Sequence, residues 1–182
     1  RKAVLGGFGV DIIELAVGST VASERIVLGD NGTVTYVALG EVGEGLPLRF
    51  ETTDTLAETG GIDTITTGAG DNTILGGMHG DAITTTLGSD TILGDNGFVQ
   101  MDAEGGNFAE IRTKSQDSAG GGTVDLGGAD TITSGDGTKR VLGGDLNDII
   151  ELAVGSTVAS ERIVLGDNGT VTYVAMLTED GL

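Results

Sequence analysis

A nine-residue pattern, repeated in phase, constrains the fold of this chain more than any other feature. Residues 6–14 read GGFGVDIIE, a full match to G-G-x-G-x-D-x-U-x, in which U is a large apolar residue. Looser copies run in phase from Glu58, where there are four, and from Asp125, where there are three. The eighth residue of every copy is aliphatic. Internal repetition at so short a period predicts a fold built by stacking similar turns.

A longer repeat contains the short one. The string from Asp11 to Ala38 recurs unchanged from Asp148 to Ala175. Residues 60–70 are similar, though not identical, to residues 127–137, and the motif LGDNG occurs three times in the chain. The simplest interpretation is a segment of a longer repetitive polypeptide. The alternative is a recent duplication within a small protein.

The composition excludes several classes of protein. The 182 residues include 34 Gly, one Pro and no Cys, and the formal net charge is −19. Collagen needs Gly at every third position and much Pro, and a disulfide scaffold needs Cys. A strongly negative chain repels nucleic-acid phosphates, whereas 38% hydrophobic residues argue against a disordered acidic tail. We expect no membrane insertion, because no apolar run reaches about 18 residues, and the first residues do not read as a signal peptide.

The nonapeptides resemble the RTX repeat, also called the haemolysin-type calcium-binding repeat. This resemblance implies that the first six residues of each copy form a turn, that the last three form a short strand, and that two copies complete one coil. The expected fold class is therefore all-β: a right-handed parallel β-roll or β-helix solenoid with projecting β-hairpins. The apolar eighth residues would form a narrow aliphatic core, since β-branched residues suit strands. These residues are Ile65, Ile74, Ile83, Ile92, Ile132, Val141 and Ile150.

The sixth residue of the nonapeptide is the candidate metal ligand. Carbonyls of glycine-rich turns and carboxylates are flexible oxygen ligands, which suit Ca²⁺ better than Mg²⁺, and the RTX resemblance implies the same ion. Stacked strands lie about 4.8 Å apart, so sixth residues of neighbouring coils would share an ion. The candidate ligands are Asp11, Asp63, Asn72, Asp81, Asp90, Asp130 and Asp148. The expected neighbours, separated by two nonapeptides, are Asp63 with Asp81, Asn72 with Asp90, and Asp130 with Asp148. Alternatively, these are ordinary turn residues that bind no metal.

Three cationic residues stand where the pattern expects Asp. Lys139 occupies a sixth position, and Arg25 and Arg162 align with Asp90 after an insertion at residues 157–161 of the second copy. One hypothesis is that the cationic side chain replaces the metal ion beside the remaining carboxylates. The other is that these turns are degenerate and solvated.

The segments between the nonapeptides predict β-hairpins. The nonapeptide regions are 1–32, 58–97 and 125–169, and residues 33–57 and 98–124 are the expected hairpin insertions, with 170–182 the start of another hairpin or the terminus. Alternating apolar and polar residues predict strands at 33–38, 48–53, 98–102 and 108–114. Five of the six aromatic residues lie in such segments: Tyr36, Phe50, Phe98, Phe108 and Tyr173. They either form contact surfaces or, as we slightly favour, fasten each hairpin to its own roll.

No catalytic constellation is evident, so we expect no enzyme, and His79 is expected to be a surface turn residue. The sequence predicts a calcium-binding structural segment of a secreted bacterial adhesin or extracellular filament. Its expected location is extracellular or at the cell surface after type I secretion, and its expected partners are copies of itself, neighbouring repeats, or a surface or matrix ligand. An alternative is the accessory RTX domain of a secreted lipase, protease or epimerase. An ice- or carbohydrate-binding solenoid ranks last, because the seventh position varies among Ile12, Thr64, Thr73, Ala82, Thr91 and Arg140.

Overall fold

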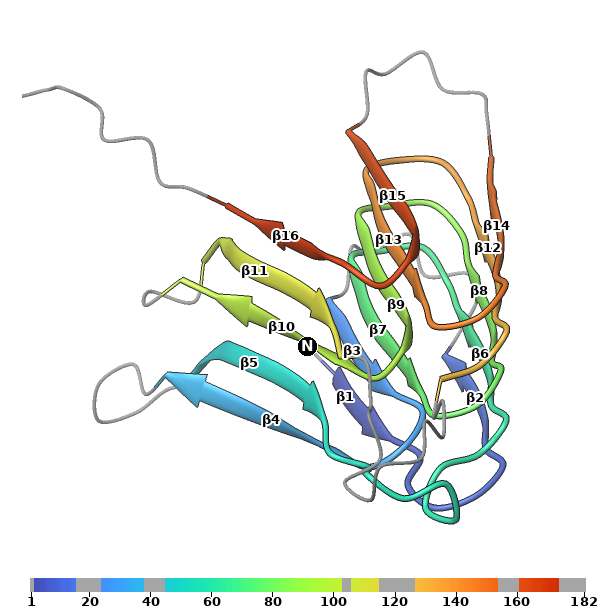
Figure 1. Cartoon of the computed structure of the whole chain (residues 1–182). Coiled ribbons are helices and arrows are strands. Elements are labelled where there is room, and N and C mark those ends of the chain that lie inside the picture. Colours follow the sequence, from blue (N-terminus) through green and yellow to red (C-terminus); the bar gives the residue numbers. More distant parts are fainter. Residues whose placement is uncertain are drawn as a thin grey trace, which may run out of the picture.

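The fold is all-β in the part of the chain that the structure describes, with parallel and antiparallel sheets (Figure 1). The structure is a computed structural model, and it describes residues 2–15, 24–37, 45–102, 106–114, 127–153 and 161–173. Within these residues there is no helix long and apolar enough to cross a membrane. Most of the predicted insertion at 157–161, and the segment after Tyr173, lie outside the described residues.

Two of the three sheets are parallel. The first parallel sheet has the order β1 (Lys2–Leu5), β3 (Arg25–Leu28), β7 (Asn72–Gly77), β9 (Asp90–Asp95), β13 (Lys139–Gly144) and β15 (Arg162–Asp167). The second has the order β2 (Ile12–Leu15), β6 (Thr64–Thr67), β8 (Ala82–Thr85), β12 (Thr131–Ser134) and β14 (Ile149–Leu152). The chain passes from one parallel sheet to the other and back, so both sheets grow in the order of the sequence.

The strand registers follow the nonapeptide period. Ile65 pairs with Ile83 and Ile74 pairs with Ile92, and in each pair the partners are separated by two nonapeptides. The same positions stay in register across the long insertions, since Ile83 pairs with Ile132. An insertion therefore leaves the stack of strands undisturbed.

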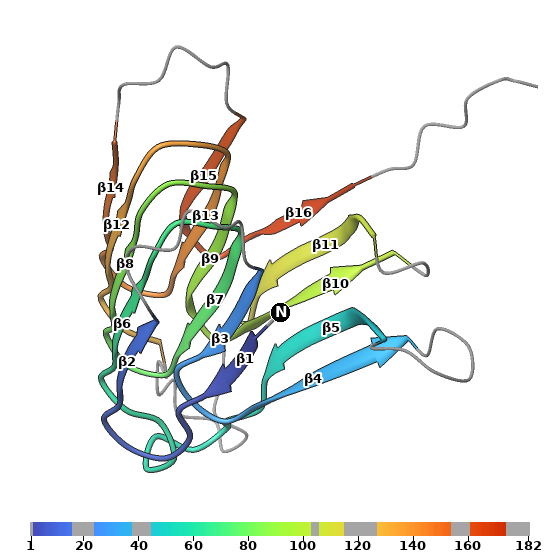
Figure 2. The ribbon, with the colours of Figure 1, turned by 180° about the vertical axis from the view of Figure 1, so that it is seen from behind.

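The third sheet is antiparallel and is made by the predicted hairpins. Its order is β4 (Gly32–Val37), β5 (Leu46–Thr52), β10 (Gly97–Met101), β11 (Phe108–Thr113) and β16 (Thr170–Thr172), read from β4. The hairpins do not project singly, because β5 of the first pairs with β10 of the second. Both views show this sheet on the far side of the first parallel sheet from the second (Figures 1 and 2).

Two apolar clusters hold these three layers together. One lies between the parallel sheets and contains the predicted core residues, with Ile65, Ile74, Ile83, Ile92, Ile132 and Val141 all at 0% exposure. Ile150 is only partly buried. The other cluster joins the first parallel sheet to the antiparallel sheet. Because the first parallel sheet is covered on both faces, β7 and β9 are buried along their whole length.

The aromatic residues of the hairpins mostly fasten the antiparallel sheet to its neighbour. Phe50 is 1% exposed and packs with Ile26, Leu28 and Leu75 of the first parallel sheet. This confirms the fastening role for Phe50. Tyr36, by contrast, is 50% exposed, so the prediction of one common role for these aromatic residues was too simple.

Leu146 stands in a backbone conformation that favours glycine. Its φ is 69°, and Gly9, at the equivalent position of the earlier copy of the long repeat, has φ 86°. Leu146 is 52% exposed, so its side chain gains little from packing. We expect Leu146→Gly to raise the free energy of unfolding by about 0.5–1 kcal/mol, because the strain of a left-handed residue exceeds the entropy lost by glycine. Urea denaturation measures this change.

Gly9→Ala is the reciprocal control. A Cβ on Gly9 meets no atom within 4 Å, so any loss of stability reports backbone strain alone. We expect a loss of about 1 kcal/mol, and an unchanged stability for both variants would contradict the strain argument.

Candidate metal centre

One row of aspartates precedes the strands of the second parallel sheet. Its members are Asp11, Asp63, Asp81, Asp130 and Asp148. The backbone N–H of each residue donates to Oδ1 of the next, at 2.8 Å for Asp11 to Asp63, 2.7 Å for Asp63 to Asp81, 2.7 Å for Asp81 to Asp130, and 2.9 Å for Asp130 to Asp148. The predicted proximity of Asp63 to Asp81 and of Asp130 to Asp148 is confirmed. The other two links span insertions and were not predicted.

Among the described residues, the second carboxylate oxygen of all five aspartates has no hydrogen-bond partner. Each Oδ2 atom is buried and accepts no hydrogen bond. The three central residues are almost fully enclosed, with Asp63 at 0%, Asp81 at 2% and Asp130 at 1% exposure. A buried oxygen without a partner costs about 1–3 kcal/mol, so five in one row call for a common cause.

Each of these oxygens lies beside a glycine in or directly after a strand of the first parallel sheet, and beside the carbonyl of the corresponding glycine of the next strand. A Cβ built on Gly29 would lie within 3.0 Å of both Asp63 Oδ2 and the carbonyl oxygen of Gly76. The same double contact recurs at Gly6, Gly76, Gly94 and Gly143. A side chain at any of these five positions would displace the two oxygens, which explains why glycine occupies them. We call this row of paired oxygens the glycine–aspartate edge.

Burial works against negative charge along this edge. It raises the pKa of Asp81 to about 10, with smaller contributions from Asp130, Asp63 and Asp30. It also raises the pKa of Asp130 to about 8, and it raises the pKa of Asp63 and of Asp148. In the absence of a cation, the protein environment therefore favours the protonated carboxyl groups. A bound cation would reverse that preference.

The donor atoms are of the type that Ca²⁺ takes, and each step of the edge supplies two of the about six to eight oxygens of a complete calcium site. Within the described residues, no three His, Cys, Asp or Glu side chains converge as they do in a metal site made of side chains alone. The available donors are instead one carboxylate oxygen and one main-chain carbonyl at each step, which are the hard oxygen ligands that Ca²⁺ takes at about 2.3–2.6 Å. The residues that would hold the ions are the five aspartates, with the carbonyls of Gly29, Gly76, Gly94, Gly143 and Gly166.

The other two candidate ligands, Asn72 and Asp90, lie on a different edge. They begin strands of the first parallel sheet, in register with the three cationic residues: Arg25, Asn72, Asp90, Lys139 and Arg162 follow one another across the sheet. Asn72 Nδ2 donates to Asp90 Oδ1 at 2.6 Å, and Thr85 Oγ1 donates to Asp90 Oδ2 at 2.7 Å. Both carboxylate oxygens of Asp90 therefore have partners, and we leave Asn72 and Asp90 out of the calcium set.

Lys139 occupies a cage of oxygens on this second edge. Its Nζ donates to Asp90 Oδ2 at 2.5 Å and to the carbonyl of Gly88 at 2.9 Å, and the two charged side chains are 0% exposed. Arg25 Nη1 similarly donates to the carbonyl of Ala69 at 2.9 Å and to Asn72 Oδ1 at 3.2 Å. The burial of Lys139 and Arg25 is compatible with the hypothesis that a side-chain cation replaces a metal ion, whereas Arg162 is exposed, as the alternative of a solvated turn predicts. We name the row from Arg25 to Arg162 the cationic edge.

The aspartates of the first two LGDNG motifs have a role that the sequence did not reveal. Asp30 accepts hydrogen bonds from the N–H of Gly61 at 2.9 Å and of Met78 at 2.6 Å. Asp95 accepts in the same way from the N–H groups of Gly128 and Asp145. Each carboxylate thus joins the chain before a hairpin insertion to the chain after it. The recurrence of LGDNG immediately before each hairpin was the available signal.

His79 lies between β7 and β8, where it forms an isolated parallel bridge with Gly127. Its Nε2 lies 3.0 Å from the carbonyl oxygen of Ala57, and its φ of 69° places it in the turn conformation of Leu146. The residue is half-buried rather than fully on the surface.

Comparisons with known proteins found no match: no family model, no curated protein and no solved structure is similar to this chain. The RTX resemblance therefore rests on the sequence of the nonapeptides alone.

Proposed function

We propose that this chain is a calcium-binding structural segment of a secreted bacterial adhesin or extracellular filament, and that it folds and stiffens when Ca²⁺ binds. The observation that carries the proposal is the row of five buried Oδ2 atoms without hydrogen bonds, each beside a glycine carbonyl. A divalent cation supplies the charge and the coordination that these oxygens lack. The aspartates hold the ion, and their Oδ1 atoms meanwhile keep adjacent turns in register.

The strand order supports an RTX-like β-roll as the fold. Short strands alternate between two parallel sheets, residues separated by two nonapeptides pair, and Gly and Asp lie in the turns. In such a stack each layer contacts only its neighbours, so it extends by repetition. The unchanged second copy of the string from Asp11 to Ala38 suits a long extracellular stalk.

The charge supports a location outside the cell. A chain with net charge −19 repels itself until cations neutralise it, so folding would be coupled to metal binding. A protein secreted by the type I route would stay unfolded where Ca²⁺ is scarce and fold outside. Its partners would be neighbouring repeats, copies of itself, or a surface ligand.

Isothermal titration calorimetry with CaCl₂ and MgCl₂ tests this function. We expect heats for Ca²⁺ and much weaker heats for Mg²⁺, which prefers a rigid octahedron. Asp81→Asn should lower the calcium stoichiometry, whereas Glu58→Gln, at a residue outside the edge, should not. Equal binding by all three proteins, or no calcium binding, would reject the proposal.

The accessory domain of a secreted enzyme is an alternative that uses the same calcium chemistry. The joined hairpins that cover a whole face of the first parallel sheet favour a structural stalk, since rolls attached to enzymes usually have more regular nonapeptides. A catalytic domain in the same gene would favour the alternative.

The outer face of the second parallel sheet favours one further candidate, binding to a flat surface such as ice. The variable seventh positions belong to two different sheets, because Thr73, Thr91 and Arg140 lie in the first. On the second sheet, Thr66 lies in register with Thr84, and Thr133 follows in the next strand. Thr64 and Thr131 flank Ala82 in the neighbouring row. An ice-recrystallisation assay tests this, with Thr84→Lys expected to abolish any inhibition.

A further inference from the structure

The outer face of the antiparallel sheet is a polar surface. Val34, Phe50, Val99, Ile111 and Val171 lie in register across the sheet and pack toward the first parallel sheet. Because side chains alternate along a strand, the residues on either side of these five point outward. In the described part of the chain, no strand lies beyond this face (Figures 1 and 2).

The outward residues form two rows in which the order of charge is reversed. Read from β4 to β16, the first row is Thr33, Glu51, Phe98, Arg112 and Thr170, and the second is Thr35, Arg49, Gln100, Glu110 and Thr172. The charges thus lie on β5 and β11, with opposite signs in the two rows. The middle strand β10 and the two outer strands are uncharged here.

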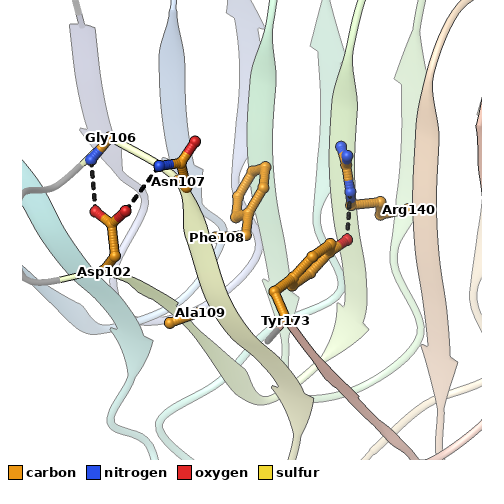
Figure 3. Close-up of a pocket in the computed structure, with 7 residues that line it drawn as sticks. All are labelled: Asp102, Gly106, Asn107, Phe108, Ala109, Arg140 and Tyr173. Atoms are coloured by element: carbon orange, nitrogen blue, oxygen red, sulfur yellow. Dashed lines mark hydrogen bonds between the residues drawn. The ribbon is translucent and has the colours of Figure 1, made fainter. Parts of the chain in front are cut away.

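Contacts on both sides of the sheet hold this face in place. On the inner side, Arg140 Nε donates to the Tyr173 hydroxyl at 2.6 Å, and the guanidinium carbon lies 4.9 Å from the centre of the Phe108 ring. These contacts tie β11 and the end of β16 to β13 (Figure 3). On the outer side, the guanidinium carbon of Arg49 lies 3.7 Å from the centre of the Phe98 ring. A face that is already ordered loses little conformational entropy on binding a partner.

The two charged strands differ in how well their charges are paired. On β5, Arg49 Nε donates to Glu51 at 2.7 Å, and the side chains are 29% and 25% exposed. On β11, Arg112 Nη1 lies 3.9 Å from Glu110 Oε1, which is too far for a hydrogen bond, and the side chains are 56% and 34% exposed. The guanidinium and carboxylate of β11 are therefore the groups of this face most open to a partner.

The charge of this face suits contact between two acidic molecules. The chain has a net charge of −19, so two copies repel each other at long range. On this face Arg49, Arg112 and Lys114, whose ammonium is paired with Glu51, stand against the carboxylates of Glu51 and Glu110. Three basic and two acidic groups give a net charge of +1. Two copies can therefore meet here without adding to that repulsion.

We propose that a second copy of this chain docks on the outer face of the antiparallel sheet, across a two-fold axis that lies in the interface, perpendicular to the strands. Each strand then faces the same strand of the other copy, running in the opposite direction. Glu110 of each copy faces Arg112 of the other, and Arg49 faces Glu51 in the same way. A two-fold interface requires a self-complementary patch of this kind.

This arrangement places two long chains side by side. The axis runs in the direction in which the strands are stacked, so the chains lie parallel and each repeat meets the same repeat. Five strands about 4.8 Å apart, with about five residues each, make a face of about 400 Å². A dimer would bury about 800 Å² in total, which is below the about 1,200 Å² of stable complexes, so one segment should bind weakly. Repetition along a chain would add avidity.

The inference rests on the proposed structural role, since it names the face by which copies associate, but it does not use the glycine–aspartate edge. Calcium binding and association can therefore fail separately. Calorimetry with CaCl₂ measures the first, and the oligomeric state of the calcium-saturated protein measures the second.

Sedimentation-equilibrium centrifugation in saturating calcium tests the proposal. We expect a monomer–dimer equilibrium with a Kd of roughly 100 µM at low ionic strength, weaker at high salt. Arg112→Glu should weaken the dimer at least about tenfold, because it sets like charges opposite each other at two symmetric contacts. The double substitution Glu110→Arg with Arg112→Glu should restore the dimer, because these two positions face each other across the axis.

Lys2→Glu is the matched control. It makes the same change in net charge as Arg112→Glu, at an exposed residue of β1 outside this face, and should leave the Kd within about twofold. Circular dichroism would confirm that each variant is folded. A calcium-binding protein that stays monomeric would overturn the proposal and leave the face to a partner of different chemistry. An equal loss in Lys2→Glu, or no recovery in the double variant, would also overturn it.

Discussion

Removal of calcium with EGTA is expected to abolish most of the β-sheet circular dichroism signal, and restoration of calcium should recover it. A ligand at about 100 times its Kd stabilises the folded state by about 2.7 kcal/mol per site. Five such sites on the glycine–aspartate edge together approach the whole stability of an ordinary domain, about 5–15 kcal/mol. The metal-free chain would also keep five buried oxygens without hydrogen bonds. An equal β-sheet signal in EGTA and in calcium would show that folding does not depend on the metal.

Asp81→Asn separates the role of the charge from that of the turn. An amide keeps an oxygen that can accept the N–H of Asp63, as Oδ1 does now at 2.7 Å, but it loses the negative charge. In calcium, we expect the free energy of unfolding of the variant to be about 3 kcal/mol lower than that of the unaltered protein, which is the contribution of one site. Asp81 is almost fully buried, and burial raises its pKa to about 10. In EGTA, where most of the chain is expected to be unfolded, the residual β-sheet circular dichroism of the variant should therefore equal or exceed that of the unaltered protein. Urea denaturation measures the difference in calcium and circular dichroism measures it in EGTA, and a loss in both would indicate a purely structural aspartate.

Lys139→Met is expected to lower the free energy of unfolding by about 3–5 kcal/mol, since it removes one partner of a buried ion pair and leaves the other charge uncompensated. The pair joins Lys139 Nζ to Asp90 Oδ2 at 2.5 Å, with both side chains at 0% exposure. The carbonyls of Gly88 and Thr86 would also lose their donor. Urea denaturation in saturating calcium measures the loss.

Arg162→Met is the matched control on the same edge. Arg162 donates to Asp136 at 3.3 Å, and its side chain is 28% exposed. The substitution should therefore lower the free energy of unfolding by less than about 1 kcal/mol. Lys139→Asp provides a further check, because it restores the residue type that the nonapeptide expects. With calcium present it should lose less stability than Lys139→Met and bind additional calcium. If all three variants lose the same stability, Lys139 does not replace a metal ion.

Much of the core and part of the site could be predicted from the sequence. The eighth residues were predicted as one aliphatic core because their spacing is regular, and Ile65, Ile83 and Ile132 are fully buried together. The aspartate pairs separated by two nonapeptides were predicted for the same reason. The links from Asp11 to Asp63 and from Asp81 to Asp130 were not, because a hairpin insertion separates these residues and its length conceals the register.

The two edges could not be distinguished from the sequence. Sixth positions look alike in the nonapeptide, yet they alternate between the two parallel sheets and so form two separate rows, one at the start of the strands of each sheet. Asp81 consequently has an Oδ2 atom that accepts no hydrogen bond from the described residues, whereas Asp90 is paired with Lys139. The threonine rows were missed for the same reason, since consecutive nonapeptides contribute to different sheets.

The sequence by itself determined the local conformation of this protein: where the chain turns, which residue of each nonapeptide is apolar, and where a carboxylate follows glycine. These properties depend on residues close together in the chain, so the period alone predicts them. Only the tertiary structure decided which strands are covered. The string RIVL is identical in β3 and β15, yet Val27 is 0% exposed and Val164 is 47% exposed. The physical reason is that β3 pairs with strands on both sides whereas β15, within the residues that the structure describes, pairs with β13 on one side only, and burial depends on neighbours that are distant in sequence.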